Sequence, residues 1–170
     1  MAVENLWAPW RMDFIRELGG KPDGCFLCDA AAGPEDRANL VVRRGRTAFC
    51  MLNRYPYNNG HLLISPFRHE GKIEALTREE LAEILTMTVE AKKLLDRLMS
   101  PNGYNVGVNL GRAAGAGLDE HFHLHVVPRW SGDTNFVTTV GSVKVIPQAL
   151  EELWEMMDEE WPKIAAEDRA

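Results

Sequence analysis

The stretch HFHLHVV, residues 121–127, decides the fold class, because polar and apolar residues alternate strictly along it. Alternate side chains of a β-strand point to opposite faces of the sheet. A strand here therefore places the imidazoles of His121, His123 and His125 on one face and an apolar row in the core. We expect Pro128 to end this strand, because proline has no N–H to donate to a neighbouring strand.

The segments on either side predict a mixed fold. Apolar residues at helical spacing predict a helix over residues 77–99, with Thr77 and Glu80 as a capping box. A second helix is predicted over residues 147–165, and Pro147 suits its first turn. The order of elements is typical of an α+β fold with an antiparallel sheet. Further strands are predicted over residues 39–44, 47–53, 61–65 and 104–109. The buried face of the first helix is predicted to hold Leu81, Ile84, Leu85, Thr88, Lys92, Leu95, Leu98 and Met99.

The length of 170 residues suits one domain, spanning residues 1–170. We divide it into an N-terminal segment (1–37), a core (38–135) and a C-terminal extension with a helix (136–170). The net charge of −6 argues against general binding of nucleic acid, whose phosphates attract Lys and Arg. No stretch approaches the roughly 18 apolar residues of a membrane span, and the N-terminus lacks a signal-peptide core. We therefore expect a cytoplasmic protein without nucleic-acid or membrane partners.

Cys25 and Cys28 form a CxxC motif in residues 21–37, which are expected to be a loop. The motif is typical of a redox pair or of half a zinc site, and it also occurs by chance. A redox pair usually opens a helix within a βαβ unit, and the prolines and glycines on both sides argue against that setting. A structural zinc ion takes four ligands, of which two cysteines supply half.

Two longer stretches resemble the histidine triad (HIT) superfamily: residues 53–69 (NRYPYNNGHLLISPFRH) and residues 104–133 (YNVGVNLGRAAGAGLDEHFHLHVVPRWSGD). The N-terminal LWAPWRM (6–12) and the later VGSVKVIPQ (140–148) are similar to the branch of diadenosine tetraphosphate (Ap4A) phosphorylases and hydrolases. The resemblance implies a HIT-like fold, with an antiparallel sheet of about five or more strands and flanking helices. It also implies a homodimer that acts on nucleotides or dinucleoside polyphosphates at the α-phosphate.

In the family, the middle histidine of the triad is the nucleophile, and here it is His123. The resemblance implies that His123 attacks the α-phosphorus and holds the nucleotidyl group covalently until water or phosphate releases it. Neutral imidazole at cytosolic pH suits this step. The implied substrate-binding residues are His61, His125, Asn53, Asn109, Gly115 and Gly117. Each of the two asparagines is explained equally well as a turn or strand-end residue. Relatives often carry a hydroxyl or amide side chain at position 117, so the choice between phosphorolysis and hydrolysis stays open.

The resemblance also bears on the cysteines. Some relatives complete a zinc site with the histidine after an SPxxH turn and with the first histidine of the triad. The matching positions are His69 and His121, so the implied ligands of a structural zinc ion are Cys25, Cys28, His69 and His121. Bound to His121, such an ion would fix the strand that positions His123. It would not act as a Lewis acid.

Other functions remain open from the sequence. A zinc hydrolase could use the H-x-H pair directly as catalytic ligands. A nucleoside phosphoramidase or another nucleotide-conjugate hydrolase of the HIT group is an alternative. A hexose-1-phosphate nucleotidyltransferase usually has glutamine where this chain has His125. A nucleotide-binding adaptor would not need an intact triad. Trp7, Trp10 and Trp130 could stack on a base, but packing explains them better.

Overall fold

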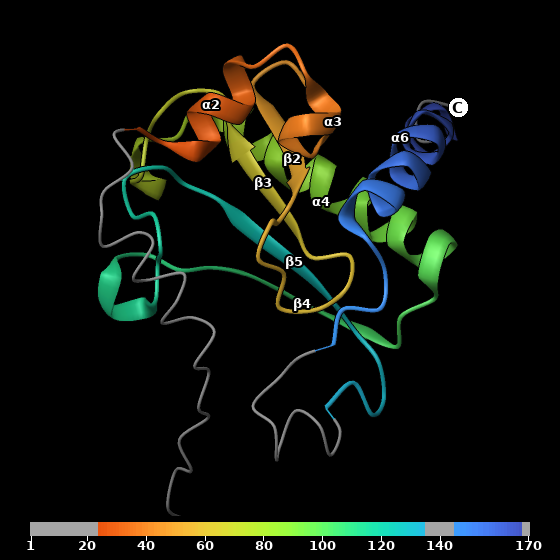
Figure 1. Cartoon of the computed structure of the whole chain (residues 1–170). Helices are drawn as coiled ribbons and strands as arrows, with labels where there is room; N and C mark the ends of the chain where they lie inside the picture. The colour runs from red at the N-terminus through yellow and green to blue at the C-terminus, as the bar shows by residue number, and fades with distance from the viewer. Residues whose placement is uncertain (1–23, 135–144, 168–170) are drawn as a thin grey trace, which may run out of the picture.

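A five-stranded antiparallel sheet forms the centre of the molecule, with strand order β1-β2-β3-β5-β4 (Figure 1). The computed structural model describes residues 24–134 and 145–167, so Trp7, Trp10 and most of the stretch 140–148 lie outside the described residues. The sheet confirms the predicted α+β class. Its strands are β1 (Val41–Arg44), β2 (Ala48–Leu52), β3 (Leu62–Pro66), β4 (Gly103–Val108) and β5 (Leu124–Arg129).

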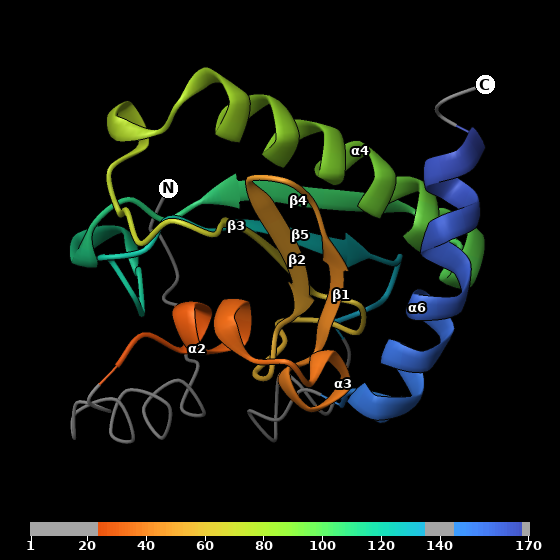
Figure 2. The same ribbon diagram turned by 90° about the horizontal axis from the view of Figure 1, so that it is seen from above.

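Helices cover both faces of the sheet, with α4 and α2 on opposite sides (Figure 2). The helix α6 packs against α4 and against β1. Within the described residues, no helix combines the length and apolarity that a membrane span requires. The helical segments are α2 (Phe26–Ala32), α3 (Asp36–Asn39), η1 (Ile73–Ala75), α4 (Arg78–Met99), η2 (Arg112–Ala114) and α6 (Leu150–Glu167).

The long helix α4 begins with the predicted capping box, in which Thr77 and Glu80 bond to each other's main chain. Two residues of its predicted buried face are exposed instead: Leu85 is 61% exposed, and the side chain of Lys92 is 54% exposed. The core-facing side is turned so that Met87, Ala91 and Leu94 are buried instead. The buried residues of this helix are Glu80, Ile84, Met87, Ala91, Leu94 and Leu95.

The last helix, α6, begins at Leu150, three residues later than Pro147. It contains Pro162, and it remains helical because its buried side docks firmly on the rest of the core. The indole N–H of Trp161 donates to Glu90 of α4 at 2.8 Å, and that of Trp154 donates to the carbonyl oxygen of Val41 at 2.7 Å.

Residues 21–37 are not only loop, which corrects the sequence-based expectation. Within this segment α2 and the start of α3 are helical. The guanidinium of Arg44 on β1 donates to the carbonyl oxygens of Ala30, Ala31 and Gly33 at 2.9, 2.6 and 3.0 Å. These are groups that the end of α2 leaves unpaired, and a cation there is also favoured by the helix dipole. A contact from β1 thus stabilises a helix too short to be stable alone.

The strand β5 begins at Leu124, so His121 and His123 lie in the extended segment that leads into it. Pro128 does not end the strand, which also contradicts the prediction. The β3 ladder stops at Val126, and Pro128 pairs only with Tyr104 of β4. Because one edge of β5 is already unpaired there, the missing N–H costs little.

The predicted alternation within the strand is confirmed. Leu124 and Val126 are buried in the main hydrophobic cluster. His125 lies beside Leu63 of β3 and Gly107 of β4 in the strand register, so it points to the other face. The functional side chains therefore gather on the face opposite α4.

Candidate functional site

Three imidazoles meet on the face of the sheet opposite α4. The ring centroids of His61 and His125 are 5.2 Å apart, and those of His123 and His125 are 5.0 Å apart. His61 is fully buried and His123 is 8% exposed. The structure thus brings together the histidine before β3 and two of the three histidines of the HFHLHVV stretch.

The main chain fixes the protonation of His123. Its Nδ1 lies 2.8 Å from the carbonyl oxygen of His121. A carbonyl oxygen only accepts, so Nδ1 carries the hydrogen and Nε2 keeps a lone pair in the neutral ring. Burial lowers the pKa of His123, against the opposing effect of this hydrogen bond. His123 therefore presents a neutral nitrogen with nucleophilic character.

In His61 the hydrogen lies on the other ring nitrogen, Nε2, because Nδ1 accepts hydrogen bonds. The backbone N–H of Tyr57 donates to its Nδ1 at 3.0 Å, and the amide nitrogen of Asn53 lies 3.3 Å from the same atom. The orientation of the Asn53 amide follows from its oxygen, which accepts from the N–H of Tyr55 at 2.9 Å. Two donors thus leave Nδ1 as an acceptor and put the hydrogen of His61 on Nε2.

That hydrogen is directed at the third imidazole. His61 Nε2 lies 2.9 Å from Nδ1 of His125, which must accept, so His125 carries its own hydrogen on Nε2. Burial, and then the charges of His125 and His123, lower the pKa of His61 to about 3. His61 is therefore neutral across the physiological range.

Sequence reasoning missed Tyr57. Its ring lies 4.6 Å from that of His61 and 5.8 Å from that of His125 between centroids, and it is 39% exposed. The available signal was an aromatic residue four positions before His61 in a loop between strands. Tyr57 forms one wall of the site and supplies a main-chain donor.

The residues before His61 explain its position. Gly60 has φ +75, and a Cβ there would lie 2.8 Å from the sulfur of Met99. Only glycine combines this backbone conformation with this close approach. Asn58 is buried and donates to the carbonyl oxygen of Pro128 at 3.0 Å and to Asp133 at 2.8 Å. The loop that carries His61 is thereby tied to the end of β5.

A second cluster lies between the start of α2, the end of β3 and the segment before β5. One ligand atom from each of Cys25, Cys28, His69 and His121 lies within 4.8 Å of the others. His121 Nδ1 is 3.2 Å from the sulfur of Cys25 and 3.4 Å from that of Cys28, and His69 Nδ1 is 3.3 Å from the sulfur of Cys28.

The donor set of this cluster fits a metal ion. His121 Nε2 donates to the carbonyl oxygen of Pro66 at 2.9 Å, so the lone pair of its Nδ1 faces the two thiols. Burial, together with a hydrogen bond from Cys25, raises the pKa of the Cys28 thiol to about 11. Two sulfur and two nitrogen donors are a ligand set that structural zinc sites use. His123 is not part of the cluster, which argues against a zinc hydrolase with both His121 and His123 as catalytic ligands.

The remaining predicted contacts lie together in one connecting segment. Asn109, Gly115 and Gly117 belong to the connection from β4 to β5, where Gly115 has φ +89. Their contacts with substrate remain predictions. The indole N–H of Trp130 donates to the carbonyl oxygen of Met99 at 3.3 Å, in agreement with the packing role that the sequence favoured.

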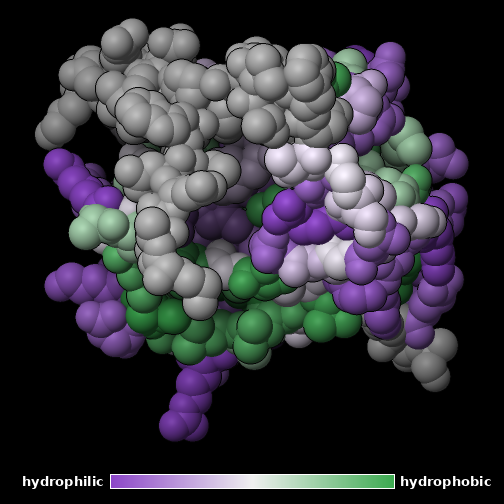
Figure 3. All heavy atoms as spheres, turned by 90° about the horizontal axis from the view of Figure 1, so that it is seen from below, coloured by the Kyte–Doolittle hydropathy of each residue, from purple (hydrophilic) through white to green (hydrophobic). Residues whose placement is uncertain are grey.

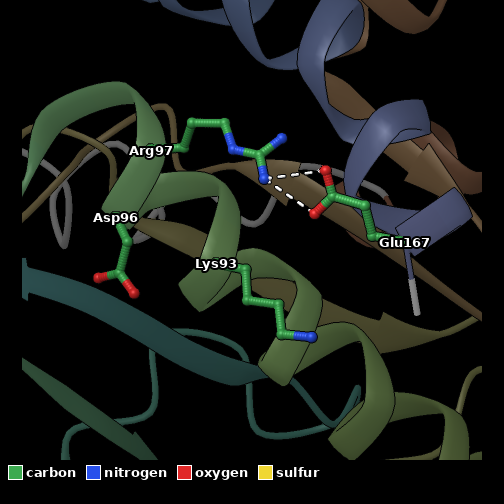
Figure 4. Close-up of a pocket in the computed structure, with 4 residues that line it drawn as sticks. All are labelled: Lys93, Asp96, Arg97 and Glu167. Carbon is green, nitrogen blue, oxygen red and sulfur yellow. Dashed lines mark hydrogen bonds and ion pairs between the residues drawn. The ribbon is translucent and has the colours of Figure 1, made fainter.

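A separate surface notch lies between α4 and α6 (Figure 4). The guanidinium of Arg97 points at Glu167, and it also bonds to Glu160 at 2.9 Å. Lys93 and Asp96 complete the lining. These ion pairs hold the two helices together, and we assign them no part in the chemistry.

The sheet and the imidazole cluster define the class of protein. The profile of the HIT domain matches residues 35–132. The chain belongs to the HIT family, and it is a nucleotidyl hydrolase or transferase of that family.

The chain is also similar to individual named proteins. The "AP-4-A phosphorylase" of Mycobacterium tuberculosis is 40% identical over 171 residues, which cover 95% of this chain and 86% of the relative. The "adenosine 5'-monophosphoramidase hnt1" of Schizosaccharomyces pombe is 28% identical over 77% of this chain and 93% of its own length.

Solved structures agree with the fold. A Zn-bound histidine triad family protein from Mycobacterium smegmatis superposes with a TM-score of 0.67 at 22% identity, covering 84% of this chain and 96% of its own. Diadenosine triphosphate hydrolase of Plasmodium falciparum superposes with a TM-score of 0.62 at 19% identity, covering 76% and 79%. At these identities the likeness establishes the fold alone.

Proposed function

We propose that this enzyme cleaves dinucleoside polyphosphates such as Ap4A at the α-phosphate, through a covalent nucleotidyl-histidine intermediate on His123. The observation that carries the proposal is the hydrogen bond from Nδ1 of His123 to the carbonyl oxygen of His121 at 2.8 Å. It leaves the Nε2 lone pair of a neutral, buried imidazole as the nucleophile. The 40% identity to a protein named AP-4-A phosphorylase supports this substrate class.

The first step forms a bond from Nε2 of His123 to the α-phosphorus. The bond from phosphorus to the bridging oxygen breaks, and its electron pair leaves with the polyphosphate. The Nε2 hydrogen of His125 stabilises the charge that develops on the phosphoryl oxygens. Water or inorganic phosphate then displaces His123 and regenerates the enzyme.

A product assay tests this proposal. The enzyme is incubated with Ap4A, with and without inorganic phosphate, and the nucleotides are separated. ATP with ADP, formed only when phosphate is present, means phosphorolysis, whereas ATP with AMP means hydrolysis. Absence of both products, or two ADP molecules without phosphate, would contradict cleavage at the α-phosphate through His123. A parallel assay with adenosine phosphoramidate tests for the activity that the fission yeast relative is named for.

We further propose that Cys25, Cys28, His69 and His121 hold a structural zinc ion. When bound, the ion would supply a fixed cross-link and no open coordination position. His121 then supports His123 through the carbonyl oxygen that it presents. Free thiols are compatible with the cytoplasm, where we place the enzyme.

The resemblance to HIT proteins and the surface together support a homodimer, with β4 at its centre. β4 is an edge strand of the sheet, and such edges are normally covered or blunted. Apolar residues gather along one side of the molecule (Figure 3). Leu85 and Val89 of α4 and Val106 of β4 are large apolar residues that are 61%, 53% and 50% exposed. Sedimentation of the wild type and of Val106→Lys tests this, since a monomeric wild type would contradict the proposal.

A further inference from the structure

Cys25 and Cys28 occupy the first turn of α2. Cys25 precedes the helix and its carbonyl oxygen accepts from the N–H of Asp29 at 2.9 Å, and Cys28 is the third residue of the helix. Residues three positions apart lie on one side of a helix, and the two sulfur atoms lie within 4.8 Å of each other. A CxxC motif that opens a helix has the placement typical of a redox pair. The structure thus meets one condition that the neighbouring prolines and glycines argued against.

The two thiols of this motif differ from the third cysteine in their access to solvent. Cys25 and Cys28 are both partly exposed, and His69 beside them is exposed. Cys50 lies on β2 and is fully buried. Because oxidation of a thiol depends on its exposure, an oxidant dissolved in water reaches the pair before it reaches Cys50.

The attachment of α2 does not depend on its sulfur atoms. Leu27, between the two cysteines, is buried in a second, smaller hydrophobic cluster together with Phe49 and Leu63 of the sheet. The guanidinium of Arg44 holds the other end of the helix through main-chain carbonyl oxygens. The bonding of the two sulfur atoms can therefore change while the helix stays on the sheet.

We propose that Cys25 and Cys28 are a site of reversible oxidation, at which a hydroperoxide converts the metal-binding pair into a disulfide and thereby empties the metal site. The inference goes beyond nucleotide cleavage, and it rests on the proposed zinc site. After oxidation, His69 and His121 are the members of the cluster that can still donate to a metal ion. Two donors are half of the set that a structural zinc ion takes, so disulfide formation and metal binding exclude each other.

The step balances with the peroxide as the oxidant. The sulfur of one cysteine attacks a peroxide oxygen, the oxygen–oxygen bond breaks, and the other oxygen leaves as water or an alcohol. The sulfenic acid formed on that sulfur condenses with the second cysteine, so that a sulfur–sulfur bond forms and water leaves. The two sulfur atoms lose two electrons, which the peroxide gains, and the two protons required come from solvent. Exchange with a dithiol reverses the oxidation.

Oxidation also acts on His121, which is fully buried. Its Nδ1 lies 3.2 Å from the sulfur of Cys25 and 3.4 Å from that of Cys28. A disulfide has no S–H to donate, so without a metal ion this buried nitrogen loses its partners. The carbonyl oxygen of the same residue holds Nδ1 of His123 at 2.8 Å. The rate of nucleotidylation should therefore fall on oxidation, to the level of Cys28→Ser, which lacks one of the same ligands.

The experiment treats the zinc-loaded, full-length protein with hydrogen peroxide. A chromogenic chelator measures the zinc released. The protein is then unfolded, its free thiols are alkylated, and disulfide-linked peptides are mapped by mass spectrometry. We expect a disulfide between Cys25 and Cys28, loss of the bound zinc, and recovery of both thiols and zinc binding after dithiothreitol and zinc are added. Cys50 should remain a free thiol throughout.

Two variants are compared with the wild type. Cys25→Ser leaves Cys28 without its partner, so peroxide should form no disulfide within the chain. Cys50→Ala is the matched control, and it should form the disulfide and release zinc as the wild type does. Nucleotidylation by the oxidised wild type should equal that of untreated Cys28→Ser, whose own rate peroxide should leave nearly unchanged.

Retention of zinc with both thiols reduced would overturn the inference, and so would a disulfide that includes Cys50. Oxidation of either cysteine that dithiothreitol does not reverse, or an equal loss of rate in peroxide-treated Cys28→Ser, would also contradict it. If Cys25→Ser fails to fold, the disulfide map of the wild type remains a complete test. Failure of the proposed zinc site looks different, because the untreated protein would then contain no zinc, and the disulfide map would still decide whether the pair is oxidised.

Discussion

A Cβ atom on Gly71 would lie 2.3 Å from the carbonyl oxygen of Asp119, because the turn after β3 packs main chain against main chain on the segment before His121. Next to this contact, the N–H of Phe122 donates to the carbonyl oxygen of Glu70 at 2.7 Å. The start of the histidine stretch is therefore held from the side by a turn that carries no catalytic group.

The first prediction follows from this close approach. Gly71→Ala should destabilise the protein by about 1–3 kcal/mol, because backbone atoms that cannot move easily must shift. It should also lower kcat/KM for Ap4A, since the shift displaces His123. Thermal unfolding and steady-state kinetics check both effects. The control is Gly103→Ala, whose Cβ would have no heavy atom within 4 Å, and it should leave both unchanged or slightly improve stability.

Replacing the nucleophile gives the second prediction. His123→Asn should reduce turnover by about 10⁴- to 10⁶-fold, the range typical of lost nucleophiles. No nucleotidyl-enzyme should be trapped, while the metal content should match the wild type because His123 lies outside the Cys–His cluster. Mass spectrometry of the quenched protein measures the intermediate. An intact intermediate on this variant would place the nucleophile elsewhere.

The third prediction concerns the metal cluster. The wild type should contain one zinc ion per chain, and Cys28→Ser should contain much less. The variant should unfold at a lower temperature, since a structural site contributes directly to folding. Its nucleotidylation rate should fall only partly, because the tautomer of His123 depends on a carbonyl oxygen and not on the ion. Elemental analysis and calorimetry on one sample provide the measurement, with Cys50→Ala as the control for zinc content, since Cys50 lies in the core outside the cluster.

The fourth prediction concerns the pH dependence of stability at Glu83. Burial raises the pKa of this carboxyl, but hydrogen bonds from the Thr47 side chain and the amides of Arg46, Thr47 and Ala48 outweigh it, so the pKa is lowered. A depressed pKa means that the carboxylate stabilises the fold above its unfolded pKa, near 4.3, and that this contribution is lost as the pH falls through the folded pKa.

Glu83→Gln should therefore be less stable than the wild type at pH 7, by about 1–3 kcal/mol. The difference should shrink as the pH falls below about 4, where the wild-type carboxyl also becomes neutral. Urea unfolding at several pH values measures it. A difference that stays constant down to low pH would show that the carboxylate charge is not involved. Glu79→Gln, at an exposed position on the same helix, is the control.

The alternation in residues 121–127 was enough to predict a strand in a sheet. It also predicted that His125 points to the face opposite Leu124 and Val126, because the alternation of side chains along a strand is local. The limits of β5 were not predictable in the same way. His121 and His123 precede the ladder, and between them the N–H of Phe122 donates to the carbonyl oxygen of Glu70 in the turn after β3. Pro128 continues the strand because its neighbour on one side has already ended, and this depends on the length of another strand.

Other differences also depend on distant contacts. The helix α2 was missed because its own seven residues give a weak signal, and the arginine that stabilises its end lies on β1. Leu85 was assigned to the wrong side of α4 because the helix carries apolar residues on two sides. Leu85 and Val89 lie on the exposed side. The ligand cluster was anticipated through the family resemblance, whereas the direction of the hydrogen bond from His61 to His125 required coordinates, since it is set by a backbone amide.

The attachment of α2 has an evolutionary consequence. Arg44 holds this helix to β1 through main-chain oxygens, which every sequence possesses, and through no cysteine side chain. A descendant that lost both thiols would still keep the helix docked beside the sheet. Metal binding and nucleotide chemistry can thus diverge separately in this lineage, and sequences that have the triad without the cysteines should retain the same architecture.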